Sequence, residues 1–168
     1  MIKNWYAVYT KPQQEQKVAA VLAKKGIDAY CPLTRIGVYT GFGKKTNWQP
    51  LFPSFVFVHI TEAQFAAIRQ ANDVINFMYW LGRPAMIPEA EIKSVQQFTS
   101  VYSNLKVEKT SIVRNAVPVR NESIEDSLGD TATTQKIKIK LSLPSLGFTL
   151  IAMAEKPAGV VDFTYERN

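Results

Sequence analysis

The sequence predicts an α+β fold, in which helices pack on a mainly antiparallel sheet, and three observations lead to it. Runs rich in aromatic and β-branched residues at 3–10, 55–60 and 74–80 are typical of buried strands. Segments with apolar residues at helical spacing follow these runs. The resulting order is strand, helix, strands, helix, strand and helix. This series of elements ends near residue 100, and its order indicates a layered sandwich.

Three helices are expected. The first spans about 12–26, because Pro12 suits a first helical turn and Gly26 suits a helix end. A second, short helix follows Thr61 and Gln64, which form a capping-box pattern. A third opens after Pro88, with carboxylates in its first turn. The apolar residues of these helices are Val18, Val21, Leu22, Phe65, Ile68, Ile92, Val95 and Phe98.

The segments between these elements are less regular. Residues 28–40 are expected to form one or two strands around Pro32, and residues 41–49 a mobile polar loop. Residues 121–135 contain acidic but no basic residues, which favours an acidic surface loop. Period-two alternation at 136–143 predicts a strand with one wet face, followed by a turn and a return strand at 148–154. The predicted organisation is a first domain at 1–101, a linker at 102–110 and a small β domain at 111–168.

Basic charge is concentrated in the first third of the chain. The net charge is +6, and residues 1–50 account for it with eight basic and two acidic residues. Such asymmetry fits a polyanionic partner, although solubility alone also explains it. Lys17 and Lys24 are seven residues apart and share a helix face, beside which Lys11 and Lys25 lie. That face either meets phosphates or is simply solvated.

No pattern typical of an enzyme, a metal site or a cofactor site is present. His59, the sole histidine, alternates in phase with the strand aromatics, which favours a structural or surface role. Cys31 cannot form an internal disulfide and is expected to be a small buried hydrophobe. The segment 41–46 lacks P-loop spacing, because Val38 stands where the first glycine belongs, so a basic hairpin tip is expected. No run approaches the roughly 20 apolar residues of a membrane helix, and a cytoplasmic protein is expected.

The predicted strands carry an unusual number of aromatic residues. Three short helices cannot cover rings on both faces of such a sheet. An exposed aromatic patch usually marks a site for a partner. The aromatic residues concerned are Trp5, Tyr6, Tyr9, Phe52, Phe55, Phe57, Phe77, Tyr79 and Trp80.

Three ordered motifs resemble the NusG family of transcription elongation factors. The segment 50–58 (Pro-Leu-Phe-Pro-Ser-Phe-Val-Phe-Val) resembles the Phe-Pro-Gly-Tyr-type motif of the family's N-terminal domain. Its form is most similar to the specialised RfaH and UpxY antiterminators of capsular polysaccharide operons. The segment 5–11 resembles the family's Trp-Tyr start, and 74–88 resembles the close of that domain. Together the motifs cover residues 4 to about 98.

The resemblance implies an NGN (NusG N-terminal) domain followed by a KOW-like β-barrel. It implies a non-catalytic factor that binds the clamp helices of bacterial RNA polymerase and the non-template DNA strand in the transcription bubble. A monomer is the default expectation, and the sequence does not indicate an oligomeric state. Whether the second domain recruits a ribosome or another factor is left open by the sequence. The positions that match polymerase contacts are Tyr9, Phe55, Phe57 and Trp80, and the candidate DNA contacts are Lys11, Lys17, Lys24 and Lys25.

The sequence also departs from the family pattern. RfaH carries a His-Thr-Thr segment that contacts the opposite side of the cleft, and the matching residues 64–66 read Gln-Phe-Ala. The glycine-marked turn that usually opens a KOW barrel is missing. A switch of the second domain to helices is not expected, since 136–140 has a strand period. A stand-alone nucleic-acid-binding module remains the alternative function.

Overall fold

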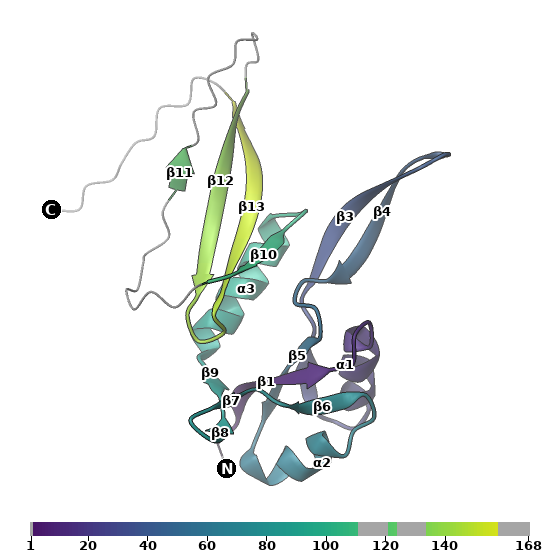
Figure 1. The fold of residues 1–168 in the computed structure, drawn as a ribbon, viewed down its shortest axis with the longest axis vertical. Coiled ribbons are helices and arrows are strands. Elements are labelled where there is room, and N and C mark those ends of the chain that lie inside the picture. The colour runs from purple at the N-terminus through teal and green to yellow at the C-terminus, as the bar shows by residue number, and fades with distance from the viewer. Residues whose placement is uncertain (1, 111–120, 124–133, 158–168) are drawn as a thin grey trace, which may run out of the picture.

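The computed structural model describes residues 2–110, 121–123 and 134–157 (Figure 1). No helix in these ranges is long and apolar enough to cross a membrane. The elements in chain order are β1 (Asn4–Thr10), α1 (Glu15–Lys24), β2 (Asp28–Tyr30), β3 (Leu33–Thr40), β4 (Gly43–Pro50), β5 (Phe55–Ile60), η1 (Glu62–Gln64), α2 (Phe65–Arg69), β6 (Val74–Phe77), β7 (Tyr79–Trp80), β8 (Arg83–Pro84), β9 (Met86–Ile87), α3 (Glu89–Val101), β10 (Lys106–Lys109), β11 (Asn121–Ser123), β12 (Thr134–Leu143) and β13 (Phe148–Pro157).

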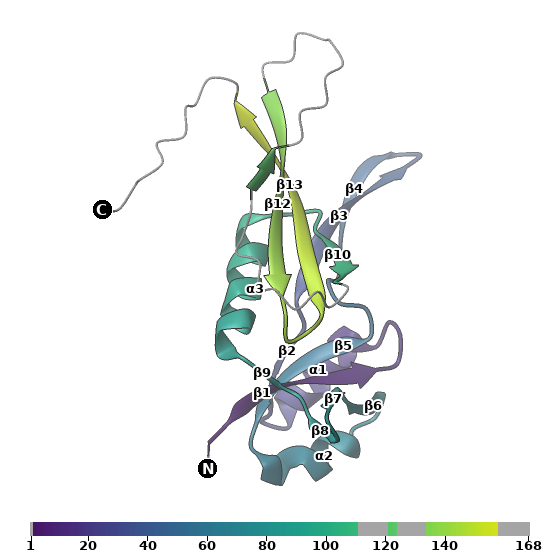
Figure 2. The same cartoon turned by 60° about the vertical axis from the view of Figure 1, so that its left-hand side comes forward.

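An antiparallel sheet forms the centre of the first hundred residues. Its strand order is β2-β5-β1-β6, and β9 also pairs with β1. Successive residues of a strand point to opposite faces, so β1 and β5 each supply side chains to two cores. Helices α1 and α2 cover one face, whereas α3 and the β12–β13 hairpin cover the other (Figure 2). The predicted α+β sandwich is confirmed for this part of the chain.

The two cores follow the alternation along β1 and β5. Tyr6 and Val8 of β1 point toward α1 and α2, whereas Ala7 between them points toward α3. The core beneath α1 and α2 consists of Tyr6, Val8, Val18, Leu22, Ile27, Val56, Val58, Ile60, Ile68, Ala71 and Phe77. The core beneath α3 consists of Ala7, Leu51, Phe52, Phe57, Ile87, Ile92, Val95, Phe98, Leu105, Leu143, Leu146, Leu150 and Ala152.

A second sheet packs against α3 and has the order β10-β13-β12-β11. Four residues of the predicted linker at 102–110 form β10, which pairs with β13. The predicted strands at 136–143 and 148–154 are confirmed as β12 and β13. A closed KOW-like barrel stays a prediction, because residues 111–120, 124–133 and 158–168 lie outside the described residues. The predicted acidic loop falls largely in the second of these ranges.

The prediction of a mobile polar loop at 41–49 is wrong. Residues 43–50 form β4, which pairs with β3 from Thr40↔Gly43 to Leu33↔Pro50. Most of β4 is exposed, and the strand therefore shows no alternation of apolar and polar residues. Hydrophobic periodicity cannot report a strand when neither of its faces is buried. The expected basic hairpin tip is present as the end of this ribbon.

Helix α1 begins three residues later than expected, at Glu15. Glu15 is buried, and its carboxylate accepts a hydrogen bond from the backbone N–H of Ser54 at 2.6 Å. Ser54 has a φ of 63°, in the left-handed region that glycine adopts more readily. Glu15 therefore ties the first turn of α1 to the turn that precedes β5. The expected capping box is confirmed by the bond from the Thr61 N–H to Gln64 Oε1 at 3.0 Å.

We expect Glu15→Ala to lower the free energy of unfolding by about 1–3 kcal/mol, because it leaves the partly buried Ser54 N–H without an acceptor. Glu15→Gln keeps an acceptor oxygen in place and should lose less than the alanine variant. Urea denaturation of the two variants beside wild type measures the difference. Equal losses for both variants would show that the hydrogen bond is not the stabilising interaction.

Candidate binding surfaces

Three of the four predicted polymerase contacts lie on one face of the central sheet. Tyr9 and Phe55 are opposite each other in the β1–β5 register, and their ring centroids are 4.6 Å apart. Phe57 is opposite Ala7, two residues along the same face. The common face follows directly from the two-residue period of a strand. We call Tyr9, Phe52, Phe55, Phe57 and Phe148 the ring cluster.

The members of the ring cluster differ in exposure. Phe57 is 1% exposed and meets Phe52 edge to face at 5.6 Å, so it belongs to the buried part of the cluster. Tyr9 is 38% exposed, and Phe55 is partly buried. In this conformation a partner could therefore touch Tyr9 and the free edge of Phe55, whereas Phe57 is covered.

Phe148 of β13 packs on the same rings. Its centroid lies 5.8 Å from that of Phe55 and 5.7 Å from that of Phe52. The C-terminal hairpin thus covers part of the aromatic surface that the sequence predicts for a partner. No sequence signal indicated this contact, because Phe148 lies more than ninety residues from the other rings.

Trp80 is not brought into the ring cluster. It lies on β7 opposite Arg83 of β8, and it is 65% exposed. Leu81, in the turn that follows, is 90% exposed and has a φ of 50°. Trp80 and Leu81 therefore form a separate apolar projection at the β7–β8 turn.

His59 and Cys31 have structural surroundings. His59 stacks on Trp5 with a centroid distance of 4.8 Å, and its Nδ1 lies 3.4 Å from a carboxylate oxygen of Asp28. Burial raises the pKa of the Cys31 thiol to about 11, so the thiol is protonated at neutral pH and is a poor nucleophile. Within the described ranges no group of three His, Cys, Asp or Glu residues could hold a metal ion.

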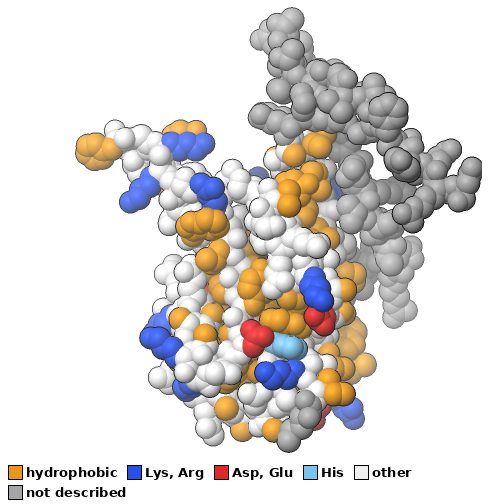
Figure 3. All heavy atoms as spheres, turned by 180° about the vertical axis from the view of Figure 1, so that it is seen from behind, with side chains coloured by type: hydrophobic (Ala, Val, Ile, Leu, Met, Phe, Trp, Pro, Cys, Tyr) orange, Lys and Arg blue, Asp and Glu red, His pale blue; other side chains and the backbone are white. Residues whose placement is uncertain are grey.

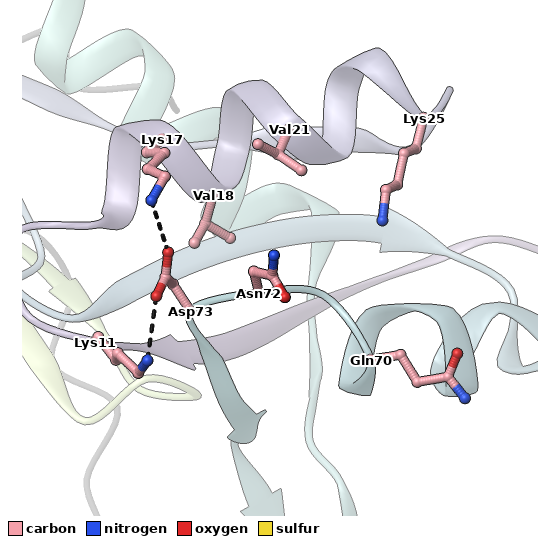
Figure 4. Close-up of a pocket in the computed structure, with 8 residues that line it drawn as sticks. All are labelled: Lys11, Lys17, Val18, Val21, Lys25, Gln70, Asn72 and Asp73. Carbon is pink, nitrogen blue, oxygen red and sulfur yellow. Dashed lines mark hydrogen bonds and ion pairs between the residues drawn. The ribbon is translucent and has the colours of Figure 1, made fainter.

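Three of the four predicted DNA contacts line one pocket. Lys11, Lys17 and Lys25 surround a cavity of about 440 Å³ between α1 and the segment that joins α2 to β6 (Figure 4). Lys24 is exposed on α1 but does not line this cavity, so the expected pairing of Lys17 with Lys24 is not what forms the site. We call this cavity the lysine pocket.

Polar side chains from 70–73 complete the lysine pocket. Gln70 and Asn72 contribute amides, each of which offers both a donor and an acceptor. Figure 4 shows Asp73 between the two lysines, with its carboxylate 3.2 Å from Lys11 Nζ and 3.0 Å from Lys17 Nζ. Sequence inspection missed Asp73, since it lies 62 residues from Lys11 and pairs with it only through the fold.

The charge state of Asp73 controls how basic the lysine pocket is. Hydrogen bonds from Lys17 and Lys11 lower the pKa of the Asp73 carboxyl below its usual value. A depressed carboxyl pKa means that the ion pairs stabilise the fold above the unfolded-state value of about 3.9 and are lost as the pH falls through the folded-state pKa. At neutral pH Asp73 is therefore ionised and offsets part of the charge of both lysines.

Comparison with known proteins places the chain in a family. Residues 3–96 match the family model described as transcription termination factor nusG. A solved structure described as "Domain interaction in Thermotoga maritima NusG" is 15% identical in sequence, with a TM-score of 0.49, and the match covers 93% of this chain and 94% of that chain. A search of curated proteins finds no match. Because the family model matches more than half of its residues, the chain belongs to the NusG family.

Proposed function

We propose that the chain is a specialised elongation or antitermination factor of the RfaH/UpxY type, acting on particular operons such as those for capsular polysaccharides. NusG proteins are non-enzymatic transcription factors and generally bind RNA polymerase. The Pro-Leu-Phe-Pro-Ser-Phe form of the motif at 50–55 supports the specialised type. The proposal rests above all on the pair of rings Tyr9, which is 38% exposed, and Phe55, which is partly buried.

The Tyr9–Phe55 pair suits the tip of an apolar helix pair such as the polymerase clamp helices. Both rings are held by the β1–β5 pairing, and they contact each other at 4.6 Å. A rigid aromatic surface loses little conformational entropy when a partner binds. Trp80 and Leu81 form a second apolar contact beyond the ring cluster in this proposal. A homogeneous binding assay with core polymerase, free of nucleic acid, tests the proposal, and Phe55→Asp is its decisive variant.

The lysine pocket suits the non-template DNA strand. Three lysines attract phosphates as point charges, and the amides of Gln70 and Asn72 can bind the edges of an unpaired base. A volume of about 440 Å³ falls within the range of small-molecule sites, so a base can enter it. Such a contact would be made only when the polymerase has melted the duplex.

We expect Asp73→Asn to strengthen DNA binding, because it removes the negative charge that pairs with Lys11 and Lys17. Lys17→Ala should weaken binding and flatten the plot of log K against log salt by about 0.7 for a single strand. Affinity for an elongation complex carrying a fluorescent non-template strand measures both effects. Lys93→Ala is the matched control, because Lys93 is an exposed lysine on α3 that pairs with Glu89. An unchanged affinity for both pocket variants would remove the lysine pocket from the proposal.

A stand-alone nucleic-acid module is the second candidate, favoured by the basic pocket alone. It predicts binding to free oligonucleotides that falls steeply with salt, with no affinity for core polymerase. The assay with core polymerase separates the two functions, because no nucleic acid is present in it.

A further inference from the structure

The β3–β4 hairpin is a ribbon that projects from the body of the protein (Figure 1). Its base is fixed by two hydrogen bonds, from the Asn104 N–H to the Arg35 carbonyl and from the Leu105 N–H to Thr34 Oγ1, both at 3.0 Å. Beyond this base, nearly all of both strands is exposed. We call residues 33–50 the arm. The arm has no role in the function proposed above.

One face of the arm carries large rings together with cations. Residues that pair across an antiparallel ribbon point to the same face. Along each strand, every second residue also points to that face. Arg35 and Trp48 form one such pair near the base, and Tyr39 and Lys44 form another near the tip. The Arg35 guanidinium lies 5.5 Å from the Trp48 ring centroid, and Lys44 Nζ lies 5.9 Å from that of Tyr39.

The rings of this face are unusually accessible. Trp48 is 55% exposed and Tyr39 is 81% exposed. Between them lie the small residue Gly37 and its partner Thr46. The Lys44 side chain lies along this face close to Gly37, where an added Cβ would come within 2.9 Å of Lys44 Cε. Arg35 and Tyr39 are four residues apart, which separates the two ring–cation pairs by about 13 Å along the ribbon.

The charge of the arm indicates that its partner is negatively charged. Residues 33–50 contain three basic residues and no acidic residue. Figure 3 shows hydrophobic and basic side chains side by side on this projection. Accessible rings interleaved with cations are typical of surfaces that bind single-stranded nucleic acid, where bases stack on the rings and phosphates meet the cations. In a duplex the bases are already stacked on each other, and the flat ring faces would find no partner.

We propose that this face of the arm is a second contact for single-stranded DNA, with bases stacking on Trp48 and Tyr39 beside Arg35 and Lys44. The choice of DNA rests on the proposed function, in which the lysine pocket holds the non-template strand. Helix α1, which lines that pocket, lies on the same side of the molecule as the arm (Figure 1). In this proposal one strand engages the lysine pocket and the arm together.

The test is a titration of the full chain with a fluorescent 15-nucleotide single-stranded DNA at low salt. The Tyr39→Ala/Trp48→Ala double variant removes both rings. Val38→Ala/Asn47→Ala is its matched control, because these residues lie on the opposite face of the same two strands. We expect the ring variant to bind at least tenfold more weakly than wild type, since each stacked base contributes appreciably, and we expect the control to bind like wild type.

Two further measurements show which ligand and which binding surface account for the result. Binding to the duplex of the same sequence should be equally weak for wild type and the ring variant. Binding to core polymerase without nucleic acid should be unchanged in the ring variant, so failure of the arm and failure of the proposed function give different results. Equal affinities of the ring variant and its control for single-stranded DNA would overturn the proposal. A clear preference of wild type for RNA of the same sequence would overturn the assignment to DNA.

Discussion

Replacing Leu150 with alanine is expected to lower the free energy of unfolding by about 2–5 kcal/mol, although Leu150 lies in the half of the chain predicted to be a separate domain. Leu150 is fully buried on β13, between Val107 of β10 and Leu141 of β12 in the sheet register. Its core also contains Ala7 and Phe57 of the central sheet. The cavity left by the substitution would therefore open against both halves of the chain.

Amide hydrogen exchange at β5 shows whether the two halves of the chain unfold as one cooperative unit or as two independent units. If the shared core makes the halves cooperative, exchange at β5 becomes faster in Leu150→Ala by the same free energy that urea denaturation reports. If the two halves of the chain unfold independently, the amide hydrogens of β5 keep their wild-type protection from exchange. Met153→Ala is the matched control, because Met153 lies on the same strand but is 56% exposed, and it should cost less than about 0.5 kcal/mol.

The elements that sequence reasoning predicts well are those with a buried face. Strands β1 and β5 and helices α1 and α3 all show their period, because one side of each packs on a core. Strand β4 was missed for the opposite reason, since both of its faces are exposed to solvent. Strand β10 was missed because Lys-Val-Glu-Lys is too short and polar to signal a strand, and its partner β13 comes about forty residues later.

The candidate sites follow the same rule. Tyr9, Phe55 and Phe57 could be placed on one face from alternation along β1 and β5. Asp73 and Phe148 could not be foreseen, because each reaches its site through contacts between segments far apart in the sequence. Gln64 and Phe65, where the sequence resemblance expects a His-Thr-Thr segment, have structural roles, since Gln64 caps a helix and Phe65 packs on Tyr6 at 5.1 Å.

Phe55→Asp is expected to weaken binding to core RNA polymerase by about 100-fold or more. The substitution places a charge at the centre of an apolar contact, where it would be buried without a partner. Affinity for labelled core polymerase measures the effect. Phe42→Asp is the matched control, because it makes the same change at a fully exposed ring on the tip of the arm. Tyr9→Ala is a milder second variant, since Tyr9 is already 38% exposed and its loss leaves the core intact.

Weak binding of the wild-type protein to core polymerase has one structural explanation, which is that Phe148 covers the ring cluster. Because Phe148 contacts Phe55 and Phe52, a partner that binds across these rings has to displace it. Phe148→Ala should therefore strengthen polymerase binding, and the gain should vanish in the Phe148→Ala/Phe55→Asp double variant. If Phe148→Ala folds and still binds no polymerase, the ring cluster is a packing surface between the two halves of the chain. The stand-alone nucleic-acid module would then be the better account of the lysine pocket.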